Sequence, residues 1–148
     1  MTDIGPASAA DADVIRDLVR AAYAHYVPRI GREPAPMTAD YPALIAAGHV
    51  WVARGTGLLG VLVLIPQPDH LLLDNVAVAP AARGTGAGSA LLAFAEAHGR
   101  SLGLPEVRLY TNAAMHENLA YYPRHGYTET HRSSSSGFHR VYFVKRLE

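Results

Sequence analysis

Residues 71–92 constrain the fold of this chain more than any other segment, because an apolar run, a glycine-rich turn and a second apolar run follow one another there. Gly84, Gly86 and Gly88 alternate within the turn. Glycine lacks a Cβ atom, so its backbone adopts unusual φ and ψ values and can approach a ligand closely. A helix that starts here adds free N–H groups and the positive end of its dipole. The segment therefore predicts a strand, a turn and a helix that together bind a phosphate or pyrophosphate.

A glycine-rich turn also occurs in P-loops, in dinucleotide-binding folds and in plain connections between a strand and a helix. A P-loop needs a lysine before its Ser or Thr, and residues 86–90 contain none. A dinucleotide fold needs Gly-x-Gly-x-x-Gly and an acidic residue at the end of the second strand, whereas here the glycines alternate and Glu106 precedes the next apolar run. A turn that only joins a strand to a helix stays open as an alternative, although each glycine weakens a helix start by roughly 1 kcal/mol.

The spacing within the turn carries a family resemblance. Arg83–Gly88 fits the pattern Arg-x-x-Gly-x-Gly and follows the segment Val76–Pro80. It resembles the core motif of the GNAT superfamily of N-acetyltransferases, in which such a loop binds the pyrophosphate of acetyl-coenzyme A. The segments Tyr110–Met115, Glu117–Tyr122 and Gly126–Tyr127 look like the second conserved block of that family. The resemblance spans nearly the whole chain.

The N-terminal third of the chain predicts a helix and a hairpin. Ser8 and Asp11 have the spacing of a capping box, and the helix that they open should run to about residue 26. Residues 49–53 and 58–64 are apolar and flank Gly55-Thr-Gly57, which predicts an antiparallel hairpin. The second of these strands is apolar almost throughout, which indicates burial on both faces. The apolar face predicted for the helix comprises Val14, Ile15, Leu18, Val19 and Ala22.

The remaining elements give the fold class. We expect strands at 71–78, 106–111, 127–132 and 139–146, helices at 86–101 and 116–124, and a hairpin tip at Ser133–Gly137. Leu91, Leu92, Phe94 and Ala95 should face inward from the first of these helices. The order ααβββαβαββ, which begins with two helices, predicts an α/β (α+β) fold with a mixed central sheet of six to seven strands and helices on both faces. The family resemblance implies that two central parallel strands splay apart and admit the pantetheine arm.

Length and composition limit the partners and the location. A chain of 148 residues suits one N-acetyltransferase domain over residues 1–148. Thirteen basic and thirteen acidic residues balance, so neither nucleic acid nor a membrane surface is an expected partner. The chain contains no cysteine, no metal-binding histidine spacing and no signal-peptide pattern at its start, which favours the cytoplasm and argues against a metal site. The resemblance also makes a homodimer an expectation, because the final strands of such folds often pair two subunits.

The resemblance assigns the site for acetyl-coenzyme A. The loop amides should bind the pyrophosphate and Arg83 should offer its charge to a phosphate. The backbone of Val76 and Val78 should pair with the pantetheine as one strand pairs with another, and Asn118 should help to hold the cofactor. The expected cofactor-binding residues are Val76, Ala77, Val78, Arg83, Gly84, Thr85, Gly86, Ala87, Gly88, Ser89 and Asn118.

Acetyl transfer also needs an acid for the departing thiolate. Tyr122 lies four residues before Gly126, as the general-acid tyrosine of the family does. Pro123 follows it, and a proline disfavours helical geometry in the preceding residue. Tyr121 is therefore the second candidate.

A base is needed because an alkylamine is mostly protonated at pH 7, and neutralising it costs roughly 4.6 kcal/mol for a pKa of about 10.4. Asp74 is the predicted base and His70 is the second candidate, since both lie on or just before the central strand. Leu72 occupies the position where some relatives carry a catalytic glutamate on this strand.

The acceptor site should follow the first helix, because that segment forms the wall of the acceptor pocket in relatives. The predicted acceptor-binding residues are Tyr23, Tyr26, Arg29, Met37 and Tyr41. The tyrosines near Arg29 suggest a flat or amphipathic amine that carries a carboxylate. The expected function is transfer of an acetyl group from acetyl-coenzyme A to a primary amine of a small molecule or peptide. A non-catalytic sensor or regulatory module that binds acyl-coenzyme A would have the same loop and stays open as the alternative.

Overall fold

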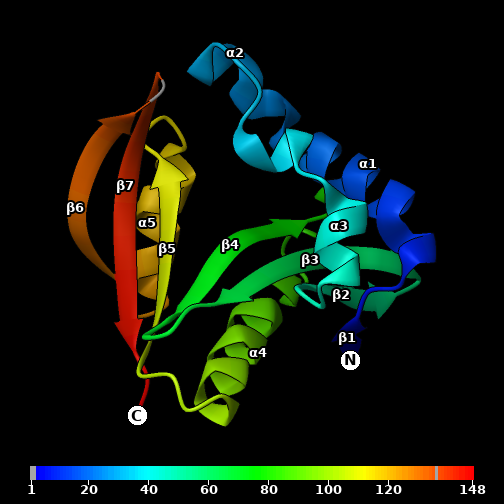
Figure 1. The fold of residues 1–148 in the computed structure, drawn as a ribbon. Coiled ribbons are helices and arrows are strands. Elements are labelled where there is room, and N and C mark those ends of the chain that lie inside the picture. Colours follow the sequence, from blue (N-terminus) through cyan, green and yellow to red (C-terminus); the bar gives the residue numbers. More distant parts are fainter. Residues whose placement is uncertain (1–2, 136) are drawn as a thin grey trace.

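The computed structural model of the protein describes residues 3–135 and 137–148, and its described part contains one seven-stranded sheet in the order β1-β2-β3-β4-β5-β7-β6 (Figure 1). The strands are β1 (Asp3–Pro6), β2 (Val50–Gly55), β3 (Gly57–Pro66), β4 (Leu71–Val78), β5 (Glu106–Asn112), β6 (Thr128–Ser135) and β7 (Phe138–Arg146). The helices are α1 (Ala12–Tyr23), α2 (Val27–Ile30), α3 (Tyr41–Ala46), α4 (Ala87–Ser101) and α5 (His116–Arg124). Short 3₁₀ helices lie at η1 (Ala9–Asp11), η2 (Ala24–Tyr26), η3 (Ala35–Thr38) and η4 (Pro80–Ala82).

The sheet is mixed, and its two halves separate in the middle. Neighbouring strands pair antiparallel except β4 and β5, which run parallel. Their register contains only the pairs Leu71 with Val107 and Leu72 with Arg108. Beyond these two pairs the strands diverge, as Figure 1 shows. The predicted fold class and the predicted splay are thus confirmed.

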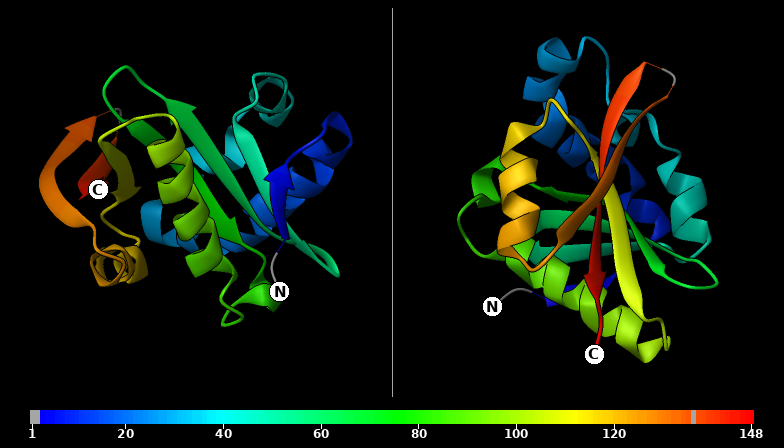
Figure 2. Two further views of the ribbon diagram at one scale, coloured as in Figure 1. Left: turned by 90° about the horizontal axis from the view of Figure 1, so that it is seen from below. Right: turned by 90° about the vertical axis from the view of Figure 1, so that its left-hand side faces the viewer.

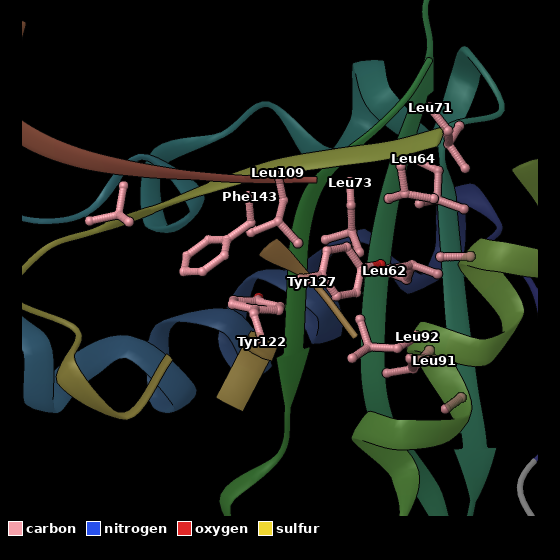
Figure 3. Close-up of a cluster of buried hydrophobic side chains, with 14 residues drawn as sticks. Leu62, Leu64, Leu71, Leu73, Leu91, Leu92, Leu109, Tyr122, Tyr127 and Phe143 are labelled. Carbon is pink, nitrogen blue, oxygen red and sulfur yellow. The ribbon is translucent and has the colours of Figure 1, made fainter. Parts of the chain in front are cut away.

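The strand β3 is buried because its side chains belong to two hydrophobic clusters, one on each face of the sheet. Leu62 and Leu64 belong to the cluster under α4, whereas Val61 and Val63 belong to the cluster under α1 and α3. Side chains of a strand alternate between its faces, so a continuous apolar run is what burial on both faces requires. Seen from below, α4 lies in front of β3 and β4 (Figure 2, left). Figure 3 shows the cluster that α4 covers, with Leu91 and Leu92 from the helix in it.

The first helix begins as predicted and ends earlier. The backbone N–H of Ser8 donates to Asp11 Oδ2 at 2.8 Å, so the capping box is formed. The α-helix stops at Tyr23 and a 3₁₀ turn continues to Tyr26. Pro28 explains the change, because proline has no N–H to donate to the carbonyl four residues earlier and its ring collides with that carbonyl. Val14, predicted on the apolar face, is 52% exposed.

Two further details differ from the sequence-based expectation. The edge strand β1 precedes α1, so the order does not begin with two helices. It pairs with β2, and its Gly-Pro ending hides the alternation typical of a strand. Of the predicted hairpin tip Ser133–Gly137, residues 133–135 belong to β6 because their backbone pairs with β7, and Ser136 lies outside the described residues.

None of the helices in residues 3–135 and 137–148 has the length and apolarity needed to cross a membrane.

Candidate functional site

The turn between β4 and α4 presents free backbone donors. Gly84 and Gly86 have φ values of 80° and 89°, a left-handed conformation that other residues adopt only at a cost. The helical hydrogen bonds of α4 begin with Ala90, whose N–H donates to the carbonyl of Gly86 at 3.0 Å. The N–H groups of the first turn of α4 therefore have no acceptor within the helix, and they lie at the positive end of its dipole. This end of α4 is suited to bind an anion.

A cavity of about 490 Å³, here called the loop cavity, lies in front of this turn. A Cβ atom added to Gly88 would lie 2.9 Å from the hydroxyl oxygen of Tyr121 and 3.5 Å from Val78 Cγ2, so a side chain there would crowd this wall. Thr85 does not line the cavity; its hydroxyl donates to the carbonyl of Ala82 within the turn. The predicted cofactor-binding residues that line it are Val76, Ala77, Val78, Arg83, Gly84, Gly86, Ala87, Gly88, Ser89 and Asn118.

The diverging part of β4 borders the same cavity. Residues 73–78 have no partner on β5, which leaves one edge of this strand open to a ligand. The carbonyl oxygen of Val76 lies 3.2 Å from the hydroxyl of Tyr23. Arg83 also lines the cavity, and its Nη2 donates to the carbonyl of Ala22 at 3.3 Å. An extended, amide-rich ligand could pair with this edge.

A second cavity of about 300 Å³, here called the splay cavity, lies between the separated halves of the sheet. Asp74 and Arg140 are the charged residues that line it among the described residues. Its aromatic lining comprises Tyr23, Tyr41, Tyr110, Tyr122 and Phe138. The cavity is therefore mainly apolar and aromatic, with one acidic and one basic side chain.

The two cavities share part of their lining, namely Tyr23, Val76, Asn118 and Tyr122. Tyr122 is 6% exposed, and its hydroxyl has no hydrogen-bond partner in the described part of the chain. Burial raises the pKa of this hydroxyl above its ordinary value of 10.0, so it stays protonated at neutral pH. Tyr121, by contrast, lines the loop cavity alone. The helix α5 continues through Pro123 to Arg124, so the proline does not displace Tyr122 from the helix.

Asp74 sits at an irregular point of β4. Val63 pairs with Asn75 and Leu64 pairs with Leu73, so Asp74 is an extra residue without a partner on β3. Such a bulge redirects side chains and is frequent next to active sites. Asp74 has no hydrogen-bonding or cationic partner among the described residues, and burial raises its pKa above 3.8. His70, the second candidate for the base, contacts Asp69 at 2.7 Å and lines neither cavity.

A chain of hydrogen bonds fixes one wall of the splay cavity and begins at Tyr23, which lines both cavities. The hydroxyl of Tyr23 donates to Asn75 Oδ1 at 2.7 Å, Asn75 Nδ2 donates to the hydroxyl of Tyr41 at 3.2 Å, and Tyr41 donates to the carbonyl of Pro36. These contacts join α1, β4 and α3 to the segment before η3. Burial raises the pKa of both tyrosines. Tyr23 and Tyr41 thus act as fixed parts of the wall.

Asn118 is positioned from β5. Its Nδ2 donates to Thr111 Oγ1 at 3.0 Å, which orients the amide on the first turns of α5. The amide oxygen of Asn118 accepts no hydrogen bond from the described residues. It is therefore free to accept one from a ligand in either cavity.

Three of the predicted acceptor-binding residues lie outside the splay cavity. Arg29 Nη1 contacts Glu117 Oε1 at 2.7 Å, and this pair lowers the pKa of Glu117 to about 2. Met37 is buried and lines neither cavity, and Tyr26 lines the loop cavity instead. The sequence around Arg29 did not predict this ion pair, because Glu117 lies far away in the chain, on α5.

Sequence reasoning missed most of the lining of the splay cavity, including Tyr110 on β5 and Phe138 and Arg140 on β7. The alternation along β5 could have placed Tyr110 on the face opposite Leu109. Only the splay of the sheet, however, makes that face a cavity wall. Within the described ranges, no group of three or more His, Asp or Glu side chains is placed to hold a metal ion.

The comparisons with known proteins agree with this geometry. The profile of the acetyltransferase (GNAT) family matches residues 13–127. The fold resembles PaiA N-acetyltransferase of Thermoplasma acidophilum, solved in complex with coenzyme A, with a TM-score of 0.83 and 15% identity over 99% of both chains. It also resembles a GNAT acetyltransferase of Staphylococcus aureus, with a TM-score of 0.79 and 14% identity over 100% of both chains. A third similar structure is the IAA acetyltransferase of Bacillus cereus, with a TM-score of 0.74 and 19% identity over 99% of this chain and 100% of that one. No curated protein sequence matches the chain.

Proposed function

Since the chain belongs to the acetyltransferase (GNAT) family, we propose that it transfers an acetyl group directly from acetyl-coenzyme A to the primary amine of a small molecule or peptide. The protein is an acyltransferase whose donor is acetyl-coenzyme A. One observation carries the proposal: the loop cavity and the splay cavity meet at Tyr122. A donor in the first cavity and an acceptor in the second would then react at this residue.

The donor side rests on the glycine turn and the open edge of β4. The predicted pyrophosphate site comprises the amides of residues 84–89. The N–H of Thr85 donates to the carbonyl of Ala82 at 3.2 Å, so the other amides of this turn would bind the pyrophosphate, and Arg83 would add a positive charge. Val76 and Val78 would pair with the pantetheine through their backbone. Ala77 would contact the donor within the loop cavity, and Asn118 would contact it where the two cavities meet. Gly88 fits this assignment because a side chain would crowd the wall there.

The reaction forms one bond and breaks another. The neutral amine attacks the thioester carbonyl carbon, so that an N–C bond forms while the C–S bond breaks. Asp74 takes the proton that the amine releases, directly or through water, and its raised pKa suits a base that must accept a proton. Tyr122 donates its hydroxyl hydrogen to the departing sulfur. The products are the acetylated amine and the free thiol of coenzyme A, and proton exchange with water then removes the proton from Asp74 and restores that of Tyr122.

No covalent enzyme intermediate is needed in this scheme. The chain contains no cysteine to act as a nucleophile. Tyr23 and Tyr41 would form the wall against which the acceptor packs, and Tyr26 would contact the donor. Arg29 and Met37 would act on the acceptor only through the segments that they anchor.

The alternative, a sensor that binds acyl-coenzyme A without turnover, has the same loop. Release of the thiol from acetyl-coenzyme A, measured with and without an added panel of primary amines, separates the two. Amine-dependent release supports the transferase. Binding of acetyl-coenzyme A without release for any amine would support the sensor.

The proposal extends to organisation and location. We take residues 1–148 as one N-acetyltransferase domain because the first and last described strands belong to the same sheet. The exposed edge of β6 could pair with a second copy, and light scattering after gel filtration tests the resulting homodimer. A chain without cysteine fits the cytoplasm, and fractionation of cells tests that location.

A further inference from the structure

The splay cavity contains one acid and one base that come from opposite halves of the sheet. Asp74 lies on β4 and Arg140 lies on β7, beyond the point where β4 and β5 separate. Neither side chain has an oppositely charged partner in the part of the chain that the structure describes. Charges that line a cavity without a partner are unfavourable unless a ligand or water compensates them. The pair therefore matches a ligand that itself carries both signs of charge.

Aromatic rings hold Arg140 in place. Its guanidinium carbon lies 4.9 Å from the ring centre of Tyr110 and 5.6 Å from that of Phe138. Both distances are within the range of cation–π contacts, which use none of the N–H donors of the guanidinium in a hydrogen bond. No described residue accepts a hydrogen bond from Arg140. Its donors are thus positioned and still available, and a carboxylate is the group that matches their fork geometry.

Tyr110 lies within electrostatic range of both charges. Burial raises the pKa of its hydroxyl, Asp74 raises it further, and Arg140 lowers it. Asp74 and Arg140 nevertheless form no ion pair with each other. The two charges therefore lie at separate points of the cavity lining, and Tyr110 lies near both.

We propose that the acceptor is a compact amino acid in which the amine and a carboxylate occupy opposite ends of an aromatic or apolar body. Asp74 would bind the amine and Arg140 would bind the carboxylate. This inference rests on the proposed function and specifies its substrate class. A volume of about 300 Å³ suits a small molecule of this kind.

The test compares three acceptors that differ at one end: 4-(aminomethyl)benzoate, its methyl ester and benzylamine. We expect the wild-type protein to prefer the acid over the ester by about tenfold to a hundredfold in kcat/KM, since a hydrogen-bonded charge pair contributes on that scale. Arg140→Gln should reduce the ratio to near unity, and Arg140→Lys should restore part of it. Arg146→Gln is the matched control, because Arg146 lies on the same strand but outside both cavities.

Equal kcat/KM for the acid and the ester in the wild-type protein would overturn the inference, as would a ratio that survives Arg140→Gln. Amine-dependent thiol release in the same assay would still uphold the proposed function. If no amine releases thiol, the proposed function fails, and calorimetric binding of the acid and the ester decides the inference separately. Tighter binding of the acid that is lost in Arg140→Gln supports it, and equal binding contradicts it.

Discussion

Replacement of Tyr122 by phenylalanine separates the chemistry from the fold. The ring packs 5.8 Å from Tyr127 and 5.7 Å from Phe143, measured between ring centres, and phenylalanine keeps these contacts. The hydroxyl has no hydrogen-bond partner among the described residues, so its removal leaves no buried group unpaired. We expect the free energy of unfolding of Tyr122→Phe to equal or slightly exceed that of the wild-type protein.

The catalytic loss follows from the bond that the hydroxyl would make to sulfur. Because burial raises the pKa of Tyr122 above 10.0, the hydroxyl donates a hydrogen bond throughout the neutral range. A hydrogen bond to a charged group contributes about 1.5–3 kcal/mol, and each 1.4 kcal/mol changes a rate about tenfold. We therefore expect kcat/KM to fall by about tenfold to a hundredfold.

A thiol-reactive chromophore measures the release of coenzyme A, and the signal is specific because the protein has no cysteine. Tyr121→Phe is the matched control, since Tyr121 is adjacent but lines only the loop cavity. Unchanged kcat/KM in Tyr122→Phe would refute the role of this hydroxyl. A larger loss in Tyr121→Phe would transfer the role to its neighbour.

Three further changes have defined outcomes. Asp74→Asn should lower kcat/KM by about a hundredfold or more. Burial raises the folded-state pKa of Asp74 above its unfolded-state value of 3.8, so the free energy of unfolding of the wild-type protein should fall as the pH rises from 3.8 to the folded-state pKa. Thermal unfolding should show that this fall is absent in Asp74→Asn. Tyr23→Phe removes the hydroxyl that donates to Oδ1 of buried Asn75 at 2.7 Å. Urea denaturation should show a loss of about 1–3 kcal/mol in the free energy of unfolding. Gly60→Ala would place a Cβ atom 2.9 Å from the carbonyl oxygen of Ala77, and calorimetric unfolding should show a loss of about 1–3 kcal/mol.

Local patterns in the sequence predicted the elements that position the site. The apolar run of β3 predicts burial on both faces because each face needs every second residue, and the structure confirms it. The strand β4 occupies residues 71–78 as predicted, and α4 starts within the glycine turn. The parallel neighbour of β4 and the splay came from the family resemblance, because no local pattern encodes them.

Contacts between distant segments could not be predicted in the same way. Arg29 pairs with Glu117, 88 residues later in the chain, and this pairing withdraws its charge from the acceptor. The bulge at Asp74 depends on how β3 and β4 align, which their sequences do not specify. Arg140 reaches the splay cavity only because β7 pairs with β5 at the separated edge.

Calorimetric titration of acetyl-coenzyme A into the wild-type protein and Gly88→Val tests the central claim most directly. A valine at this position would meet the hydroxyl of Tyr121 and fill part of the loop cavity, whereas Ala97→Val creates a valine at an exposed position of the same helix by adding two methyl groups. The account predicts one binding site in the wild-type protein and Ala97→Val, and its loss in a folded Gly88→Val. No binding to the wild-type protein, or equal binding to both valine variants, would contradict it.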